Sequence, residues 1–428
     1  MTQQLFTEYR SLYSSSREHP QIIRLRIRMR DLIDPEVVET AVQTTMKRYP
    51  YFCVELKRND TGEWTAVPNP RLVTVHHSDL GVDLNAPESN YHIIAFSWYD
   101  NWITMDISHA ITDGTGAYEV MRTFLYYYCT ERYQVTLPEK GIRLAGDEIP
   151  EEEWSDPVAS AENLPVPNRT EISKALNLLQ DGLIQNDHRN TVYSISIPES
   201  EFMRFNIDHD GSPATMVSLF LSRAVAKLFP DSSDTIRITM CVNERNALHA
   251  PLAHQSLVGG AMLEYKDRIR SWPVDRQATA YRGMVYAQTT EEAVLSGVAS
   301  QKGLTQLILS KATDQERMAI AASLGQMAGR ILTATVSYVG KAEYKGAEQY
   351  IRDFRSWTYS TGSPVLIEIA AVNGKFYLDV IQMFSSAIVV EALLKEFEEN
   401  GIAYDLQDVR KLQLPNLRLP WSDYYSGN

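Results

Sequence analysis

A histidine and an aspartate stand four positions apart in a segment that could carry acid–base chemistry. The segment covers residues 108–114 and reads SHAITDG, with His109 near its start and Asp113 near its end. Histidine suits proton transfer because its unperturbed pKa lies close to neutral pH, and a positioned general base contributes about 10²–10⁴ in rate. These residue types predict that His109 acts as a general base.

Asp113 can support such a base in two ways. Its carboxylate can orient the imidazole directly, as in a catalytic triad. Alternatively, the carboxylate can turn away and pair with a cation, which would fix the turn that carries His109. The three intervening residues slightly favour the second arrangement, because side chains on a non-helical turn need not face each other. The residues alone leave both arrangements open.

The elements around this turn are predicted from the alternation of apolar and polar residues. Residues 102–108 alternate in polarity, which indicates a strand with one buried face, and residues 91–98 supply the other arm of a hairpin. After the turn, an apolar stripe predicts a helix over about 117–133. A histidine at the end of a strand, on a tight turn that holds Gly114 and Gly116, can project into a cleft.

Strands and helices alternate along the rest of the chain. Strands are predicted at 22–30, 51–57, 64–67, 191–197, 235–242, 331–338, 365–371 and 375–381, and helices after Asp34-Pro35, from Glu199, and at 213–228, 274–292, 314–328 and 386–399. Interleaved hairpins indicate an α/β fold with mixed sheets, and not a purely parallel doubly wound sheet. The acidic, proline-rich segment 151–175 is predicted to link one half, 1–150, to another, 176–428.

Composition narrows the classes of function. A chain of 428 residues is long enough for two domains. Its formal net charge of −13 argues against a nucleic-acid partner and an anionic membrane surface. Three widely spaced cysteines and the absence of a long apolar run indicate a cytoplasmic protein without a membrane span. Motifs for nucleotide hydrolysis, dinucleotide redox chemistry, serine hydrolysis and zinc proteolysis are missing, and no metal site is expected.

Residues 109–114 match HxxxDG, the signature of the chloramphenicol-acetyltransferase-like and condensation-domain superfamily. Residues 241–245 (CVNER), followed by 257–260 (LVGG), resemble a segment of the family's second domain, and 337–340 (SYVG) resemble a strand end near its active-site tunnel. The resemblance covers most of the chain. Because Ser108 stands where condensation domains usually carry a second histidine, the chain is most similar to free-standing alcohol acetyltransferases and polyketide-associated acyltransferases.

The resemblance implies a fold and a set of site residues. Two chloramphenicol-acetyltransferase-like halves would form a V-shaped pseudo-dimer with a tunnel between them, and His109 would be the general base. The active-site loop would be supported by Asp113, Gly114 and Arg245, the aspartate and the arginine forming an ion pair. Ser337 is a candidate donor to the oxyanion, and Asn243 a second contact in that region. The segment 353–357 only echoes a DFGWG motif of the plant branch and is taken as coincidence.

The resemblance also implies an acyl transfer from a thioester to a small alcohol or amine. The co-substrate would be a coenzyme A thioester, with no permanently bound cofactor. A phosphopantetheine thioester on an acyl carrier protein, as in a condensation-type enzyme, is the alternative donor. The alternative from another class of function is that the protein is no enzyme but a binding module on the same fold, without turnover.

Other conspicuous residues are predicted to be structural. The arginines of strand 22–30 are interpreted as a solvated or ion-paired face, with phosphate binding as the lesser alternative. His76-His77 is interpreted as a loop, and Tyr126-Tyr127-Tyr128 as a partly buried helix. His249 and His254 follow Arg245 closely and are candidates for the cleft, or simply loop residues.

Overall fold

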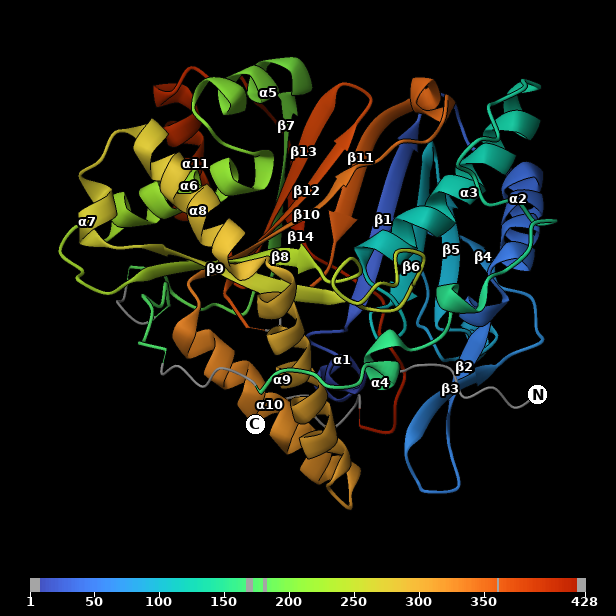
Figure 1. The fold of residues 1–428 in the computed structure, drawn as a ribbon. Helices are drawn as coiled ribbons and strands as arrows, with labels where there is room; N and C mark the ends of the chain where they lie inside the picture. The colour runs from blue at the N-terminus through green and yellow to red at the C-terminus, as the bar shows by residue number, and fades with distance from the viewer. Residues whose placement is uncertain (1–7, 167–171, 180–182, 360–361, 422–428) are drawn as a thin grey trace.

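Two β-sheets, each covered by helices, carry the two lobes of the protein (Figure 1). The computed structural model describes residues 8–166, 172–179, 183–359 and 362–421. A five-stranded sheet has the order β11-β1-β6-β5-β4, and a seven-stranded sheet has the order β14-β7-β13-β12-β10-β8-β9. Both sheets mix parallel and antiparallel pairs, since β4–β5, β10–β12 and β10–β8 are parallel. The predicted mixed α/β class is confirmed.

The first lobe is built mainly from the N-terminal part of the chain, with α2 and α3 packed together on one side of its sheet. Its elements are α1 (Tyr9–Ser14), β1 (Ile22–Met29), α2 (Pro35–Arg48), β2 (Val54–Arg58), β3 (Trp64–Pro68), β4 (Val75–His77), β5 (Ile94–Tyr99), β6 (Trp102–Ser108) and α3 (Gly114–Tyr133). The short helix α4 (Pro157–Ser160) lies in the segment that follows.

The second lobe places α6, α8 and α11 against its sheet, while α9 and α10 extend beneath both lobes (Figure 1). Its elements are β7 (Thr191–Pro198), α5 (Glu199–Asp208), α6 (Pro213–Leu228), β8 (Ile236–Asn243), β9 (Val258–Tyr265), α7 (Asp267–Arg270), α8 (Val274–Gln288), α9 (Glu291–Leu309), α10 (Asp314–Ile331), β10 (Ala334–Lys341), β11 (Ile351–Trp357), β12 (Val365–Val372), β13 (Lys375–Gln382), α11 (Ile388–Glu399) and β14 (Asp405–Lys411).

Strand β11 crosses between the lobes. It follows β10 in sequence, yet it pairs antiparallel with β1 of the first sheet, with Arg26 opposite Arg355 and Ile27 opposite Phe354. The pairing covers one edge of β1, while β6 covers the other. The second part of the chain therefore completes the sheet of the first lobe. The division at 1–150 and 176–428 stays a prediction, and residues 167–171 and 180–182 lie outside the described structure.

Several predicted boundaries need correction. Helix α3 begins at Gly114 and not at 117, because Asp113 caps it by accepting a hydrogen bond from the Gly116 N–H at 3.3 Å. The strand predicted at 51–57 begins at Val54, since Pro50–Phe52 form a 3₁₀ turn. The helix predicted over 274–292 ends at Gln288, and α9 follows as a separate helix. Within the described residues, no helix combines the length and the hydrophobicity that crossing a membrane requires.

Candidate active site

His109 directly follows β6, and the central position of this strand fixes where the residue lies. β6 pairs with β1, placing Ser108 opposite Ile22, and the backbone N–H of His109 donates to the carbonyl of Gln21 at 2.8 Å. The imidazole is half-buried, and its Nδ1 atom is buried with no hydrogen-bond partner among the described residues. The sheet thus holds the backbone of His109 while the ring stays unpaired at Nδ1.

Asp113 and Arg245 form a buried, bidentate ion pair between segments 132 residues apart. Both N–O distances are 2.9 Å, and the two side chains are 1% and 3% exposed. The carboxylate also accepts from the backbone N–H of Leu257 at 3.0 Å. Since these donors and the Gly116 N–H occupy both carboxylate oxygens, Asp113 holds the turn and does not orient the imidazole as in a triad.

Arg245 extends the same contact into the loop that follows it. Its Nε donates to the carbonyl of Ala253 at 2.7 Å, and its Nη2 donates to that of Gln255 at 2.8 Å. Asn243 is exposed, but its side-chain oxygen accepts from the backbone N–H of Arg245 at 3.0 Å and from Nη1 at 3.3 Å. The structure thus gives Asn243 a contact with Arg245, and its predicted role as an oxyanion or tunnel contact stays a prediction.

The start of α3 packs so closely against the second lobe that only glycine fits. A Cβ atom on Gly114 would lie 2.6 Å from Cγ2 of Val339 on β10. One on Gly116 would lie 2.1 Å from the hydroxyl of Thr112 and 2.7 Å from the carbonyl oxygen of His254. Glycine at these positions is explained by close approach, and the HxxxDG turn lies at the contact between the lobes.

Ser337 lies on β10, half-buried, beside Glu368 of β12. Burial raises the pKa of the Glu368 carboxyl to about 7. Burial also raises the pKa of the Cys241 thiol on β8 to about 12. The role of Ser337 at the oxyanion stays a prediction. Glu368 was missed by sequence reasoning, because an isolated glutamate in an apolar strand carries no motif.

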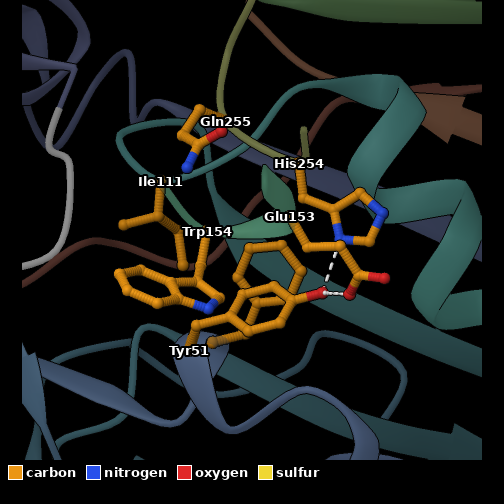
Figure 2. Close-up of a pocket in the computed structure, with 7 residues that line it drawn as sticks. Tyr51, Ile111, Glu153, Trp154, His254 and Gln255 are labelled. Carbon is orange, nitrogen blue, oxygen red and sulfur yellow. Dashed lines mark hydrogen bonds between the residues drawn. The ribbon is translucent and has the colours of Figure 1, made fainter. Parts of the chain in front are cut away.

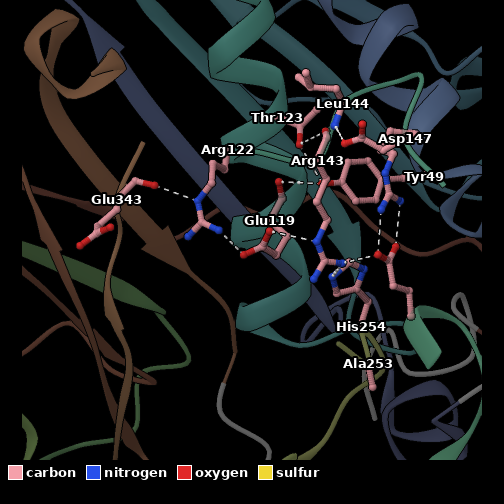
Figure 3. Close-up of polar contacts among 12 residues, drawn as sticks. Tyr49, Glu119, Arg122, Thr123, Arg143, Leu144, Asp147, Ala253, His254 and Glu343 are labelled. Carbon is pink, nitrogen blue, oxygen red and sulfur yellow. Dashed lines mark hydrogen bonds and ion pairs between the residues drawn. The ribbon is translucent and has the colours of Figure 1, made fainter. Parts of the chain in front are cut away.

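His254 lies directly behind the HxxxDG turn, in a buried polar network (Figures 2 and 3). Its carbonyl oxygen accepts from the hydroxyl of Thr112 at 2.6 Å, and its Nδ1 lies 2.6 Å from the hydroxyl of Tyr51. Arg143 donates to its Nε2 at 2.6 Å. Because an arginine has no acceptor, Nε2 must be the unprotonated nitrogen, and Nδ1–H donates to Tyr51. Burial, and then the charge of Arg143, lower the pKa of His254 well below its usual value.

Glu153 provides the negative charge of this network. Its carboxylate accepts hydrogen bonds from both Nη atoms of Arg48, at 2.8 and 2.7 Å, and from the hydroxyl of Tyr51 at 2.9 Å. It also pairs with Arg143 at 3.0 Å. Nε of Arg143 also lies 3.6 Å from the carboxylate of Glu119 on α3, and Figure 3 shows Arg143 beside Glu119 and His254. Part of the segment predicted to be a linker is therefore anchored behind the HxxxDG turn, and His254 has a structural place there.

Two cavities lie next to the turn. A cavity of about 20 Å³ is enclosed by Tyr51, Phe52, Ile111, Glu153, Trp154, His254 and Gln255, and it has room for about one water molecule (Figure 2). A cavity of about 550 Å³ lies among α1, α4 and α9. Its wall includes Glu8, whose N–H donates to the carbonyl of Ala110 at 2.7 Å. Residues 108–114 do not line this larger cavity, and Glu8 connects its wall to the turn through this hydrogen bond.

The remaining candidates are structural in these surroundings. Arg24 and Arg26 are buried and pair with Asp106 and Asp79. The prediction that His76 and His77 form a loop is wrong, because they form the end of strand β4 and pair with β5. The ring of His77 stacks on Trp98 at 4.2 Å. The described residues include no cluster of histidine, cysteine or acidic side chains that could hold a metal ion.

No family model and no curated protein matches this chain. Solved structures do match over nearly its whole length. Polyketide synthase associated protein 5 from Mycobacterium tuberculosis aligns at 14% identity and a TM-score of 0.62, covering 92% of this chain and 96% of that one. F. sporotrichioides TRI101, complexed with coenzyme A and T-2, aligns at 12% identity and a TM-score of 0.58, covering 93% of this chain and 98% of that one.

The first condensation domain of the CDA synthetase aligns at 11% identity and a TM-score of 0.58, covering 93% of this chain and 94% of that one. Identities this low establish a shared fold and leave the reaction open. The expected two-lobed architecture is confirmed, and the chain has the fold of the chloramphenicol-acetyltransferase-like and condensation-domain proteins.

Proposed function

We propose that this protein is an acyltransferase that moves an acyl group from a thioester to an alcohol or amine, with His109 as the general base. The observation that carries the proposal is the half-buried His109 on a turn that Asp113 and Arg245 fix from both lobes. A free imidazole on a rigid turn suits proton transfer, because the base must be held within hydrogen-bond reach of the acceptor.

The reaction follows from this geometry. His109 takes the proton of the acceptor hydroxyl or amine while the acceptor atom attacks the thioester carbonyl. The tetrahedral intermediate collapses, the carbon–sulfur bond breaks, and the imidazolium returns its proton to the leaving thiolate. Ser337 is the candidate donor to the oxyanion, and losing one such donor typically lowers turnover by about 10²–10³.

Coenzyme A is the preferred carrier of the acyl group. TRI101, which shares the fold, is described in complex with coenzyme A. Ser108 replaces the second histidine of condensation domains, which favours a free-standing enzyme. Three unpaired cysteines suit a reducing compartment such as the cytoplasm. The substrates would meet in a passage between the lobes.

Replacing the base tests the function directly. We expect His109→Ala to lower the rate of acyl transfer from acetyl coenzyme A by at least about 10², the contribution of one positioned base. The melting temperature should stay close to that of the wild type, because Nδ1 of the ring has no partner to lose. His249→Ala is the matched control, since that histidine is 79% exposed. Full transfer by His109→Ala would show that the mechanism is wrong.

A carrier-protein donor is the second candidate, favoured by the condensation domains among the similar structures. Comparing the rates of acyl transfer from equal amounts of acetyl coenzyme A and an acetylated carrier protein would show which donor the enzyme uses. A binding module without turnover would release no thiol from either. Thiol release above background that is lost in His109→Ala excludes the binding module.

A further inference from the structure

Three polar side chains form a row on the face of the second sheet that is turned toward the first lobe. Ser337 on β10 is the register neighbour of Glu368 on β12, which is the register neighbour of Asp379 on β13. Alternate residues of these strands pack into the core of the second lobe. Ala370, which follows Glu368 on the same face, packs instead with the core of the first lobe.

Asp379 has the partners that a buried carboxylate needs. It accepts from the hydroxyl of Ser194 at 2.5 Å and from the backbone N–H of Ser356 at 2.9 Å, and Nε of Arg355 lies 3.8 Å away. Arg355 also pairs with Asp353, so the single cation is shared between two carboxylates. Asp379 therefore has hydrogen-bond partners that Glu368 lacks, although burial still raises the pKa of its carboxyl to about 6.

Glu368 lacks such partners. It is 9% exposed, and no lysine, arginine or histidine of the described residues pairs with it. Its register neighbours are Ser337 on β10 and Asp379 on β13, and the titratable groups near enough to interact with its charge are Asp379, Cys241 of β8 and Tyr118 of α3. None of these supplies a positive charge. Burial, and to a smaller degree the charge of Asp379, raise the pKa of Glu368 to about 7.

The position of Glu368 connects it with the catalytic turn. Ser337 precedes Val339 by two residues, so both side chains point to the same face of β10, about 7 Å apart along the strand. Val339 is the residue against which Gly114 of the HxxxDG turn packs. A buried carboxyl group without a cation costs stability, which makes this position a candidate for binding a positively charged group of a ligand.

We propose that Glu368 is a specificity residue of the acyl acceptor, whose carboxyl group binds an amino group that the acceptor carries in addition to its nucleophile. An amino group supplies the missing positive charge and the hydrogen-bond donors. The acyl chain of the donor is apolar and the phosphates of coenzyme A are anionic, so neither complements a carboxylate. The inference rests on the proposed function, because it assigns the acceptor of that reaction.

The stability of the free protein tests whether the charge is uncompensated. Above about pH 7 Glu368 is ionised in the folded protein at a cost, whereas near pH 5 it is protonated. We expect Glu368→Gln to raise the melting temperature at about pH 8 and to change it little at about pH 5. A lower melting temperature for Glu368→Gln at both pH values would mean a structural role and overturn the proposal.

Acceptor selectivity tests recognition. With acetyl coenzyme A as donor, we compare hexanol with aminohexanol, which differ in the distal amino group. The wild type should favour aminohexanol by roughly tenfold or more in kcat/KM, an amount that one charged contact can supply. Glu368→Gln should lose this preference, and the loss should come mainly from a higher KM for aminohexanol. An unchanged preference in the variant would overturn the proposal.

A binding measurement separates this proposal from the proposed reaction. Aminohexanol should raise the melting temperature of the wild type at about pH 8 more than hexanol does, and the difference should vanish in Glu368→Gln. This result requires no turnover. If neither alcohol is acetylated while the difference in melting temperature is observed, the reaction is wrong and the amine site stands. If the difference is absent, the amine site is wrong whatever the reaction.

Discussion

At the scale of single residues, the protein supports its candidate base through a side chain from the other lobe. Asp113 lies four positions after His109, yet its carboxylate serves Arg245 and not the imidazole. The HxxxDG turn is thus fixed by a contact that no local pattern encodes. The resemblance named Arg245 because the motif brings its partner segment with it, whereas spacing alone left the role of Asp113 open.

Replacing one partner of this ion pair should destabilise the protein more, per residue replaced, than replacing both partners together. Asp113→Ala leaves the guanidinium of Arg245 buried without a partner, and Arg245→Ala leaves the carboxylate of Asp113 in the same state. We expect each to lower the free energy of unfolding by about 3–5 kcal/mol. The double replacement should cost less than the sum of the two, because it strands no charge. Guanidinium denaturation of all four proteins measures this coupling, and strictly additive losses would contradict it.

At the scale of elements, alternation and turn chemistry predicted the strands that have one apolar face. The hairpin of β12 and β13 follows from Asn373-Gly374, where both residues have positive φ angles, 48° and 78°. Strand β14 was not predicted, because its sequence DLQDVRK is polar and it pairs as an edge strand only with β7. Glu368 was not predicted as a site residue for a related reason. Whether a glutamate has a cation beside it depends on which strands become its neighbours in the sheet.

The segment behind the HxxxDG turn makes the stability of the protein sensitive to acid. His254 is neutral in the folded protein because its pKa is lowered well below 6.5, whereas in the unfolded chain it titrates near 6.5. As the pH falls below about 6.5, the unfolded state binds a proton that the folded state excludes, so stability is lost. Above about pH 6.5, where His254 is neutral in both states, this loss of stability is absent. Tyr51 and Glu153 cannot compensate the charge, because Arg48 and Arg143 already neutralise the carboxylate.

Replacing the histidine should remove this dependence. Between about pH 7 and pH 5, the free energy of unfolding of the wild type should fall more steeply than that of His254→Asn, whose side chain does not titrate. Urea denaturation at several pH values measures the slopes. His249→Asn is the control and should keep the wild-type slope, since that side chain is largely exposed. Equal slopes for the wild type and His254→Asn would place the acid sensitivity elsewhere.

At the scale of the whole molecule, the two lobes are joined by exchanged structure and by close contact. Strand β11 leaves the second lobe to complete the sheet of the first, and the HxxxDG turn packs on β10 of the second lobe. The sequence predicted the two-lobed class and most of the strands. The crossing of β11 could not be predicted, because nothing in its residues distinguishes pairing with β1 from pairing within its own half.

The contact between Gly114 and Val339 sets how closely the lobes meet at the candidate base. Gly114→Ala places a methyl group 2.6 Å from Cγ2 of Val339, so the branched side chain of Val339, β10 or the turn must shift. Since a displacement of about 1 Å in a catalytic arrangement can cost about 10² in rate, we expect acyl transfer to fall by roughly that factor. Adding Val339→Ala removes the obstructing atom and should restore most of the activity, whereas Val339→Ala alone should change it little. Steady-state rates of all four proteins measure the effect, and a Gly114→Ala enzyme that is impaired but not rescued by Val339→Ala would show that the spacing of the lobes is not what the glycine protects.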